Sequence, residues 1–347
     1  MSQLLIDALD NAGQWQAFAA DGATPSTQLA VKADARDFRY GADKQSLRVS
    51  GSVNALNHRV RRTLNPLDLS NFDELRVWFK SSRSADGSTA RPFFLEVRLA
   101  SATMDLNAPG NTWVRLIPIA QANTWELAQF SLQDLPSAIR SAVNVIQLRC
   151  VDASVPFTFH LDDLLAVRHE MIGDVDAALL ARLDKQLTLN GTPAPAVIYS
   201  PPDKPANTPT PHLRITHFDL RFAEERTLYS QARSDYTATG FRLRPFSAAY
   251  DLSYEIAAVA DSRAEQTRLL EFVLAAFVPY GTLLVNGIQL PIECVNVASD
   301  DLIGGSYNGN VLLHFVVRTY QARSGAGEPA TPPFNEVSIA LDQPTPA

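Results

Sequence analysis

Strict alternation of apolar and polar residues in the first half of the chain is the feature that most limits its fold. In the segment FDELRVWFK, Leu75, Val77 and Phe79 alternate with polar or outward positions, and RPFFLEVRLA repeats the pattern. A period of two places one apolar set on one face of a sheet, so both segments are predicted strands. Turn-rich pieces such as SRSADGSTA and DASVP separate several more segments of this kind. The first half is therefore expected to be an all-β, two-sheet sandwich.

The hydrophobic period changes near Ile172. In IGDVDAALLARLDKQL, apolar residues from Ile172 to Leu187 recur at helical spacing, with Asp174 as the expected N-cap. The four tryptophans all precede residue 126, and a chain of 347 residues is long for a single core. We therefore expect a β-sandwich over 1–168, an α+β domain over 169–323 and an extended arm over 324–347.

The second half mixes strand and helix signals. YDLSYEIAAVA alternates like a strand, and Ser262 and Glu265 have the spacing of a capping box before a long amphipathic helix. The Asn286-Gly287 pair between two apolar runs predicts a two-residue hairpin, since both turn positions need positive φ.

Two proline-rich segments are expected to make contacts with other chains. The density of prolines over 191–211 is incompatible with a helix or the interior of a sheet, so it is expected to be a surface loop. The arm that begins at residue 324 contains NEVSIAL, which could add as an edge strand to another subunit.

Composition and motifs argue against several function classes. A net charge of −7 disfavours nucleic acid and anionic membranes as partners. No secretory signal is expected from the N-terminal segment, and no apolar run approaches the roughly 18 residues of a membrane span. Cys150 and Cys294 lie in separate apolar runs and suit a reducing cytoplasm.

The same survey finds no catalytic pattern. The histidines form no metal-binding pair, and no phosphate-binding glycine motif or nucleophile elbow occurs. Adjacent acids such as Asp162 and Asp163 would point to opposite faces of a strand, which suits a glycosidase poorly. We expect a protein that is not an enzyme.

The segment from about Ile172 to Tyr320 resembles the tail-terminator-like domain of contractile phage tails and phage-like injection particles. The most specific parts are FDLRFAEER, which contains Arg226, and the block from Pro245 through Tyr250 to Tyr254. The resemblance implies an α+β domain that forms a hexameric ring on a tail tube. Arg226, Tyr250 and Tyr254 would then be interface or core anchors. Here the segment follows a whole β-domain, whereas this domain usually stands near the N-terminus of such proteins.

The first half resembles a galactose-binding-like jelly roll of the kind found in carbohydrate-binding modules. The resemblance is carried by LIDAL, PLDLSNFDELRVWFK, the FSLQDLP block after Trp125, and the closing FTFHLDDLLAVR. In many relatives an acidic residue near each end of the module holds a structural Ca²⁺, and here the candidates are Asp7 with Asp162 or Asp163. The alternative is that these are exposed carboxylates at a strand end.

Two aromatic rings fall on the polar-patterned side of predicted strands. Trp78 and Phe94 could form a flat platform for stacking sugars. The alternative is that a second domain or another subunit covers them.

These observations lead to one main expectation and one rival. The main expectation is a structural protein of a phage tail or phage-like particle, assembled in the bacterial cytoplasm. It would form a ring with copies of itself and contact tube, sheath or neck proteins. The rival is a glycan-binding accessory or adhesion protein that uses the jelly roll.

Overall fold

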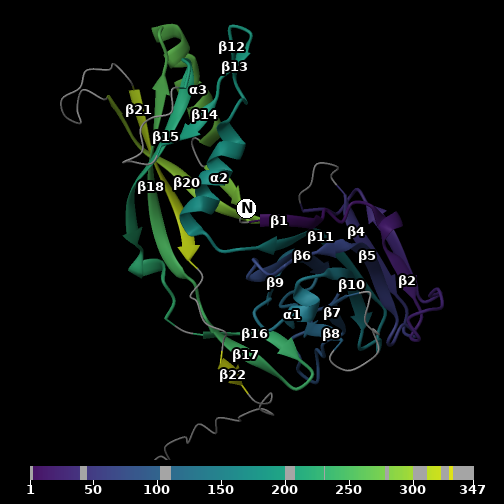
Figure 1. Cartoon of the computed structure of the whole chain (residues 1–347). Helices are drawn as coiled ribbons and strands as arrows, with labels where there is room; N and C mark the ends of the chain where they lie inside the picture. Colours follow the sequence, from purple (N-terminus) through teal and green to yellow (C-terminus); the bar gives the residue numbers. More distant parts are fainter. Residues whose placement is uncertain are drawn as a thin grey trace, which may run out of the picture.

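The computed structural model describes residues 3–39, 45–101, 111–199, 208–229, 231–277, 281–299, 311–321 and 328–330. Figure 1 shows the N-terminal half as a compact β-structure and the C-terminal half as a tall sheet with two helices beside it. The two halves have separate hydrophobic cores, one built from residues before 167 and the other from residues after 174.

The N-terminal half is a β-sandwich, as the alternation predicted. Its six-stranded sheet contains, in order, β3 (Leu29–Asp34), β4 (Ser46–Gly51), β11 (Phe157–Val167), β6 (Glu74–Ser81) and β9 (Glu126–Ser131), with β1 (Gln3–Asp7) paired to β11. Its five-stranded sheet contains β2 (Gln16–Phe18), β5 (Arg59–Leu67), β10 (Val143–Cys150), β7 (Leu95–Ala100) and β8 (Thr112–Leu116). A 3₁₀ turn, η1 (Ala12–Gln14), and the short helix α1 (Ser137–Arg140) lie in the connections. The apolar sets of both sheets meet between the layers, in the manner of a jelly roll.

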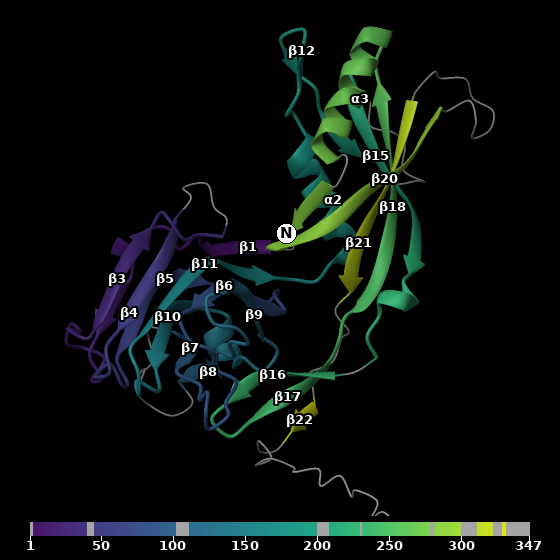
Figure 2. The same ribbon diagram turned by 180° about the vertical axis from the view of Figure 1, so that it is seen from behind.

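The C-terminal half contains a second six-stranded sheet. Its order is β14 (Ala196–Ile198), β15 (His212–Phe222), β18 (Ala248–Val259), β21 (Val311–Gln321), β20 (Ile288–Ser299) and β19 (Gly281–Val285). Helices α2 (Met171–Leu183) and α3 (Arg263–Phe277) pack on one face, and Figure 2 shows both helices on the same side of this sheet. Two short strands, β12 (Thr188–Leu189) and β13 (Thr192–Pro193), follow α2.

Of the two predicted helix starts, the one at α3 is confirmed and the one at α2 is wrong. Helix α2 begins at Met171, so Asp174 lies in its first turn and is not the N-cap. Its carboxylate instead accepts a hydrogen bond from the backbone N–H of Glu170 at 3.1 Å. The capping box of α3 is confirmed, because Ser262 Oγ accepts from the N–H of Glu265 and donates to its carboxylate.

Two hairpins of the C-terminal half reach the sandwich. The first, β16 (Gln231–Thr237) with β17 (Gly240–Pro245), is inserted between β15 and β18 and follows η2 (Glu224–Arg226). Strand β22 (Glu328–Ala330) pairs with β17. The second is the predicted turn between β19 and β20, where Asn286 and Gly287 have φ of 50° and 79°. That turn prediction is confirmed.

The predicted proline-rich loop is partly a strand. Within 191–211, β14 pairs in parallel with β15 and forms the edge of the sheet. An edge tolerates the neighbouring prolines because one side of the strand needs no donor. Residues 200–207 and most of the predicted arm, including NEVSIAL, lie outside the described residues. Cys150 and Cys294 form no disulfide with each other, and no helix in the described ranges is long and apolar enough to cross a membrane.

Candidate functional site at the junction of the halves

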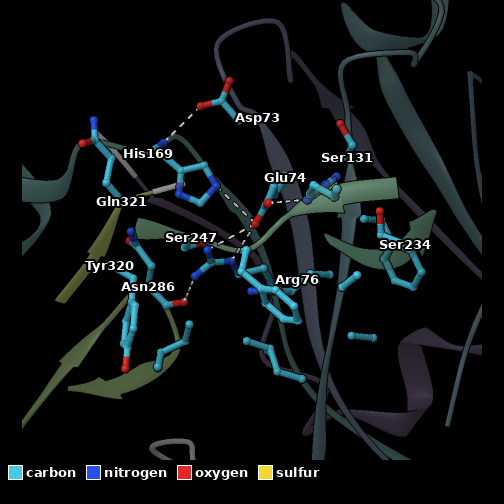
Figure 3. A pocket seen from close by; sticks show the side chains of 18 of the residues that line it. Asp73, Glu74, Arg76, Ser131, His169, Ser234, Ser247, Asn286, Tyr320 and Gln321 are labelled. Carbon is cyan, nitrogen blue, oxygen red and sulfur yellow. Dashed lines mark hydrogen bonds and ion pairs between the residues drawn. The ribbon is translucent and has the colours of Figure 1, made fainter. Parts of the chain in front are cut away.

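A cavity of about 860 Å³ lies between the six-stranded sheet of the sandwich and the C-terminal half. Its walls come from β6, β9, the β16–β17 hairpin, the β19–β20 turn and the end of β21. Figure 3 shows side chains from both halves pointing toward one another in this space. Cavities of this size between structural units are common binding places in proteins.

A buried carboxylate, Glu74, joins several parts of the chain at this cavity. Its oxygens lie 3.2 Å from Arg76 Nη2, 2.7 Å from Arg244 Nη1 and 3.2 Å from His169 Nε2 (Figure 3). Burial by itself would raise the pKa of this carboxyl. The hydrogen bond from His169, followed by the nearby positive charges, outweighs burial and lowers the pKa of Glu74 to about 2. Glu74 is therefore ionised at neutral pH and cannot serve as a general acid there.

The β19–β20 turn is bonded to the sandwich through its backbone. Arg76 Nη1 donates to the carbonyl of Asn286 at 3.0 Å, and Trp78 Nε1 donates to the carbonyl of Gly287 at 3.0 Å. The side chain of Asn286 donates to Asp174 at 2.7 Å, which ties the turn to α2. The sharp turn predicted from sequence thus presents two carbonyls to the outer face of β6.

The β16–β17 hairpin is bonded to β9, the strand beside β6 in the same sheet. Asp235, at φ 50°, accepts from the N–H of Ser131 at 2.7 Å and from Arg244 at 2.8 Å. Nearby, Arg242 lies 3.1 Å from the carboxylate of Asp134. The sandwich is therefore held at two separate places by charged or buried polar contacts.

Six exposed apolar side chains lie at or next to the adjoining ends of β15, β18 and β21. We call this set the strand-end patch: Leu220, Phe222, Leu228, Tyr229, Phe246 and Tyr320. The pairing of Phe222 with Tyr250, and of Tyr250 with Thr319, places Phe222 and Tyr320 on opposite faces of the sheet. Phe222 contacts Tyr250 with ring centroids 5.5 Å apart, and the residues after η2 are tied to β18 by a bond from the N–H of Ala249 to Thr227. Three members of the patch also line the cavity. The cavity is thus lined both by the charged side chains around Glu74 and by exposed apolar side chains of the strand-end patch.

The rings predicted as a sugar platform are not available for one. Trp78 is only 9% exposed, bonded to Gly287, and covered by the guanidinium of Arg39 at 4.3 Å from its ring. Phe94 is fully buried and packs against Phe157 at 5.3 Å. Trp78 is thus covered, as the alternative predicted: Arg39 of the sandwich lies over the ring, and the β19–β20 turn of the other half bonds its N–H.

The predicted calcium ligands do not converge. Asp7 pairs in the ladder with Leu164, a core residue, whereas Asp162 pairs with Trp78 on the outer face. Directly paired residues share a face, so the two carboxylates lie on opposite sides of the sheet. Asp163 occupies an irregular position at φ 46°.

The surroundings of Asp7 and Asp163 also differ from those of a calcium site. Asp7 forms an ion pair with Arg62 and accepts a hydrogen bond from Trp15 Nε1 at 2.9 Å. Burial, and then the charge of Asp10, raise the pKa of Asp163. Within the described ranges, no group of three or more His, Cys, Asp or Glu side chains is placed to hold a metal ion. The structure therefore contradicts the predicted calcium site at Asp7, Asp162 and Asp163.

The three predicted anchors make contacts within the chain. Tyr254 is fully buried and donates to Asp176 at 2.7 Å, so it is a core residue. Arg226 donates to the carbonyl of Tyr250 at 3.1 Å and to Asp251 at 2.5 Å, and lies over the ring of Tyr320. Arg226 and Tyr250 thus shape the sheet end that carries the strand-end patch.

Sequence reasoning missed the charged residues of the junction, namely Glu74, His169, Asp235 and Arg244. On a strand pattern, Glu74 and Arg244 look like ordinary solvent-facing charges. Their partners are far away in the sequence, and no local spacing signals the pairing. The one available signal was Trp78, a large ring on a face that otherwise appeared polar.

No protein-family model and no curated protein matches the chain. Among solved structures, similar ones include a family 11 carbohydrate-binding module from Clostridium thermocellum, determined with a mixed-linked tetrasaccharide. It is 14% identical and has a TM-score of 0.35, over 48% of this chain and 98% of that one. A family 30 module of a cellulosomal cellulase of the same organism is 13% identical, with a TM-score of 0.35 over 49% and 99%.

A further similar structure is the enzymatically active domain of tailspike protein 4 of bacteriophage CBA120. It is 12% identical with a TM-score of 0.31, and the match covers 46% of this chain and 20% of that one. The named structures are thus two carbohydrate-binding modules and one phage tailspike domain.

Proposed function

We propose that this chain is a non-catalytic assembly protein of a phage tail or phage-like particle, in which the C-terminal half makes the contacts and carries the sandwich as a fixed projection. The observation that supports this is the strand-end patch. Leu228, Tyr229 and Tyr320 are each more than half exposed. Several exposed apolar side chains near one sheet end are typical of an interaction surface. Aromatic residues are also enriched at such surfaces.

The fixed mounting of the sandwich fits this role. A buried charge cluster and two hairpins hold it, and a projection with a fixed orientation can keep the same geometry in every copy of a ring. A flexible tether would need none of these contacts. The ring, its subunit number and assembly in the bacterial cytoplasm are parts of this proposal.

Polar substitution in the patch is expected to weaken self-association. Phe222→Ser and Leu228→Ser should each raise the dissociation constant by about tenfold or more, the equivalent of about 1.4 kcal/mol. Sedimentation velocity over a concentration series measures this. The matched control is Val53→Ser, which removes a side chain of similar exposure from the sandwich. A wild-type chain that stays monomeric at high concentration, with or without tube proteins, would contradict the assembly role.

A second candidate is glycan binding by the sandwich, and two of the solved structures named above are carbohydrate-binding modules. The feature that favours glycan binding is the outer face of the five-stranded sheet. This face lies on the far side of the sandwich from the junction, with the six-stranded sheet in between. There Arg61 donates to Gln147 at 3.2 Å, and Arg149 lies 2.6 Å from Glu96. Arg61 also lies over the ring of Phe18 at 4.6 Å, so hydrogen-bonding groups adjoin an aromatic face.

This candidate predicts sugar binding that depends on the five-stranded sheet. The intact chain should bind members of a glycan array, and Arg61→Ala should reduce the affinity by about tenfold, as expected for the loss of a charged hydrogen bond. Phe222→Ser, on the other half, should leave that affinity unchanged. If the intact chain binds no glycan on the array, this second candidate fails.

A further inference from the structure

The edge of the sandwich that faces the cavity is an open strand edge. Strand β9 pairs with β6 and with no other strand of the described chain. All of its residues, Glu126–Ser131, line the cavity. A strand edge that faces a cavity is a template for an added strand.

The contacts of Ser131 show which backbone groups point into the cavity. Its N–H donates to Asp235 of the β16–β17 hairpin, so it is directed away from β6. In an antiparallel pair, backbone groups alternate between the partner strand and the free side. The N–H and C=O groups of Gln129 and Leu127 therefore point toward the free edge as well. Asp235 closes one end of this edge and leaves the remainder accessible from the cavity.

The side chains around the edge define what kind of strand would fit. Leu228, Phe246 and Tyr320 form an exposed apolar wall. Arg233 lines the same cavity and forms no ion pair with an acidic group in the part of the chain that the structure describes. A strand that is apolar on one face and places an acidic residue near Arg233 would therefore fit.

Residues 331–347 of this chain have that composition. They contain Glu336 and Asp342 and no Lys, Arg or His. Val337, Ile339 and Leu341 alternate with smaller or polar residues, which is the pattern of a strand with one apolar face.

The direction of β22 indicates a second copy as the donor. Strand β22 is antiparallel to β17, and its last residue, Ala330, pairs with Phe241 near the hairpin tip. The cavity lies at the opposite end of β17, where Pro245 is part of its wall. Strand β22 thus runs toward the hairpin tip and away from the end of β17 at the cavity, and Figure 1 shows β22 on the side of the hairpin away from β18.

We infer that residues 335–341 of one copy add as a strand to the β9 edge of a second copy, within the cavity at the junction. This inference rests on the proposed assembly role and names the contact that joins neighbouring copies. The added strand would bond to Leu127 and Gln129 and cover the exposed apolar wall, while its acidic residues approach Arg233.

Disulfide trapping between two full-length chains tests this contact. One chain, carrying an affinity tag, has Gln129→Cys; the other has a single cysteine at one position from 335 to 341. Both chains also carry Cys294→Ser, which removes the less buried native thiol. Adducts between chains are expected at alternate positions of the 335–341 series, because strand neighbours alternate with a period of two. Val53→Cys, an exposed position of the sandwich outside the cavity, is the control and should give no adduct.

Other outcomes overturn the inference. Adducts that form only when both cysteines are in one chain would mean that the segment occupies its own cavity. Absence of adducts, or adducts of equal strength along the series, would mean that no strand is added. If these occur while sedimentation still shows self-association, only this contact fails. If the wild-type chain does not self-associate at all, the proposed function fails with it.

Discussion

Replacing Glu74 with glutamine is expected to destabilise the folded chain by about 3–5 kcal/mol, the usual range when one partner of a buried ion pair is removed. Glu74 is 7% exposed and lies against both Arg76 and Arg244. Glutamine is nearly the same size, so packing is retained while the negative charge is lost. Arg76 would then lose the carboxylate beside it, and Arg244 would keep its contact with Asp235 but lose the one with Glu74.

Urea unfolding followed by fluorescence measures this change, because Trp78 lies directly at the junction. The matched control is Glu293→Gln, which removes an ion pair with Arg318 on the surface, where both side chains are about half exposed. An exposed pair of that kind contributes about 0–1 kcal/mol. Equal losses for the two variants would show that the Glu74 cluster contributes no more than a surface ion pair.

Acid is expected to remove the same stabilisation in a defined pH range. The pKa of Glu74 is about 2 in the folded chain, against an ordinary value of 4.5. A carboxyl whose pKa is lowered on folding stabilises the fold fully above its unfolded pKa and loses that contribution as the pH falls toward the folded one. The contribution of Glu74 should therefore be intact at pH 6 and decline below about pH 4.5, by about 3 kcal/mol in total.

The Glu74→Gln variant isolates this contribution from other acid effects. The difference in unfolding free energy between wild type and variant should be largest above pH 5 and shrink steadily as the pH approaches 2. Other carboxyls titrate in the same range, but they do so in both proteins and cancel in the difference. A difference that stays constant from pH 6 to pH 2.5 would rule out Glu74 as the titrating group.

Local sequence signals predicted the elements that depend on neighbouring residues. The Asn286-Gly287 turn and the capping box of Ser262 and Glu265 were predicted because each depends on a few adjacent residues. The prediction for Asp174 was wrong because its carboxylate is used by the Asn286 side chain and by the N–H of Glu170, and the first of these partners is distant in sequence.

The candidate site was largely beyond sequence reasoning. Trp78 looked exposed because its own strand placed it opposite the core set, but Arg39 and the β19–β20 turn of the other half cover it. Asp7 and Asp162 looked like a pair because both lie near ends of the sandwich sequence, but the ladder places them on opposite faces. In both cases the sequence did not show which distant residues would lie against these side chains.

The sequence by itself determined the two hydrophobic cores, the strand and helix periods, and the sharp turns, since all of these follow from the spacing of apolar residues and from backbone preferences over a few positions. Only the tertiary structure decided that Glu74, His169 and Arg244 meet, that the outer face of β6 is covered, and that β9 has an open edge. These depend on contacts between residues up to about 200 positions apart, such as Arg76 with Asn286. Free energy at such contacts comes from burial and charge pairing between whole units, which leaves no repeating pattern in the chain.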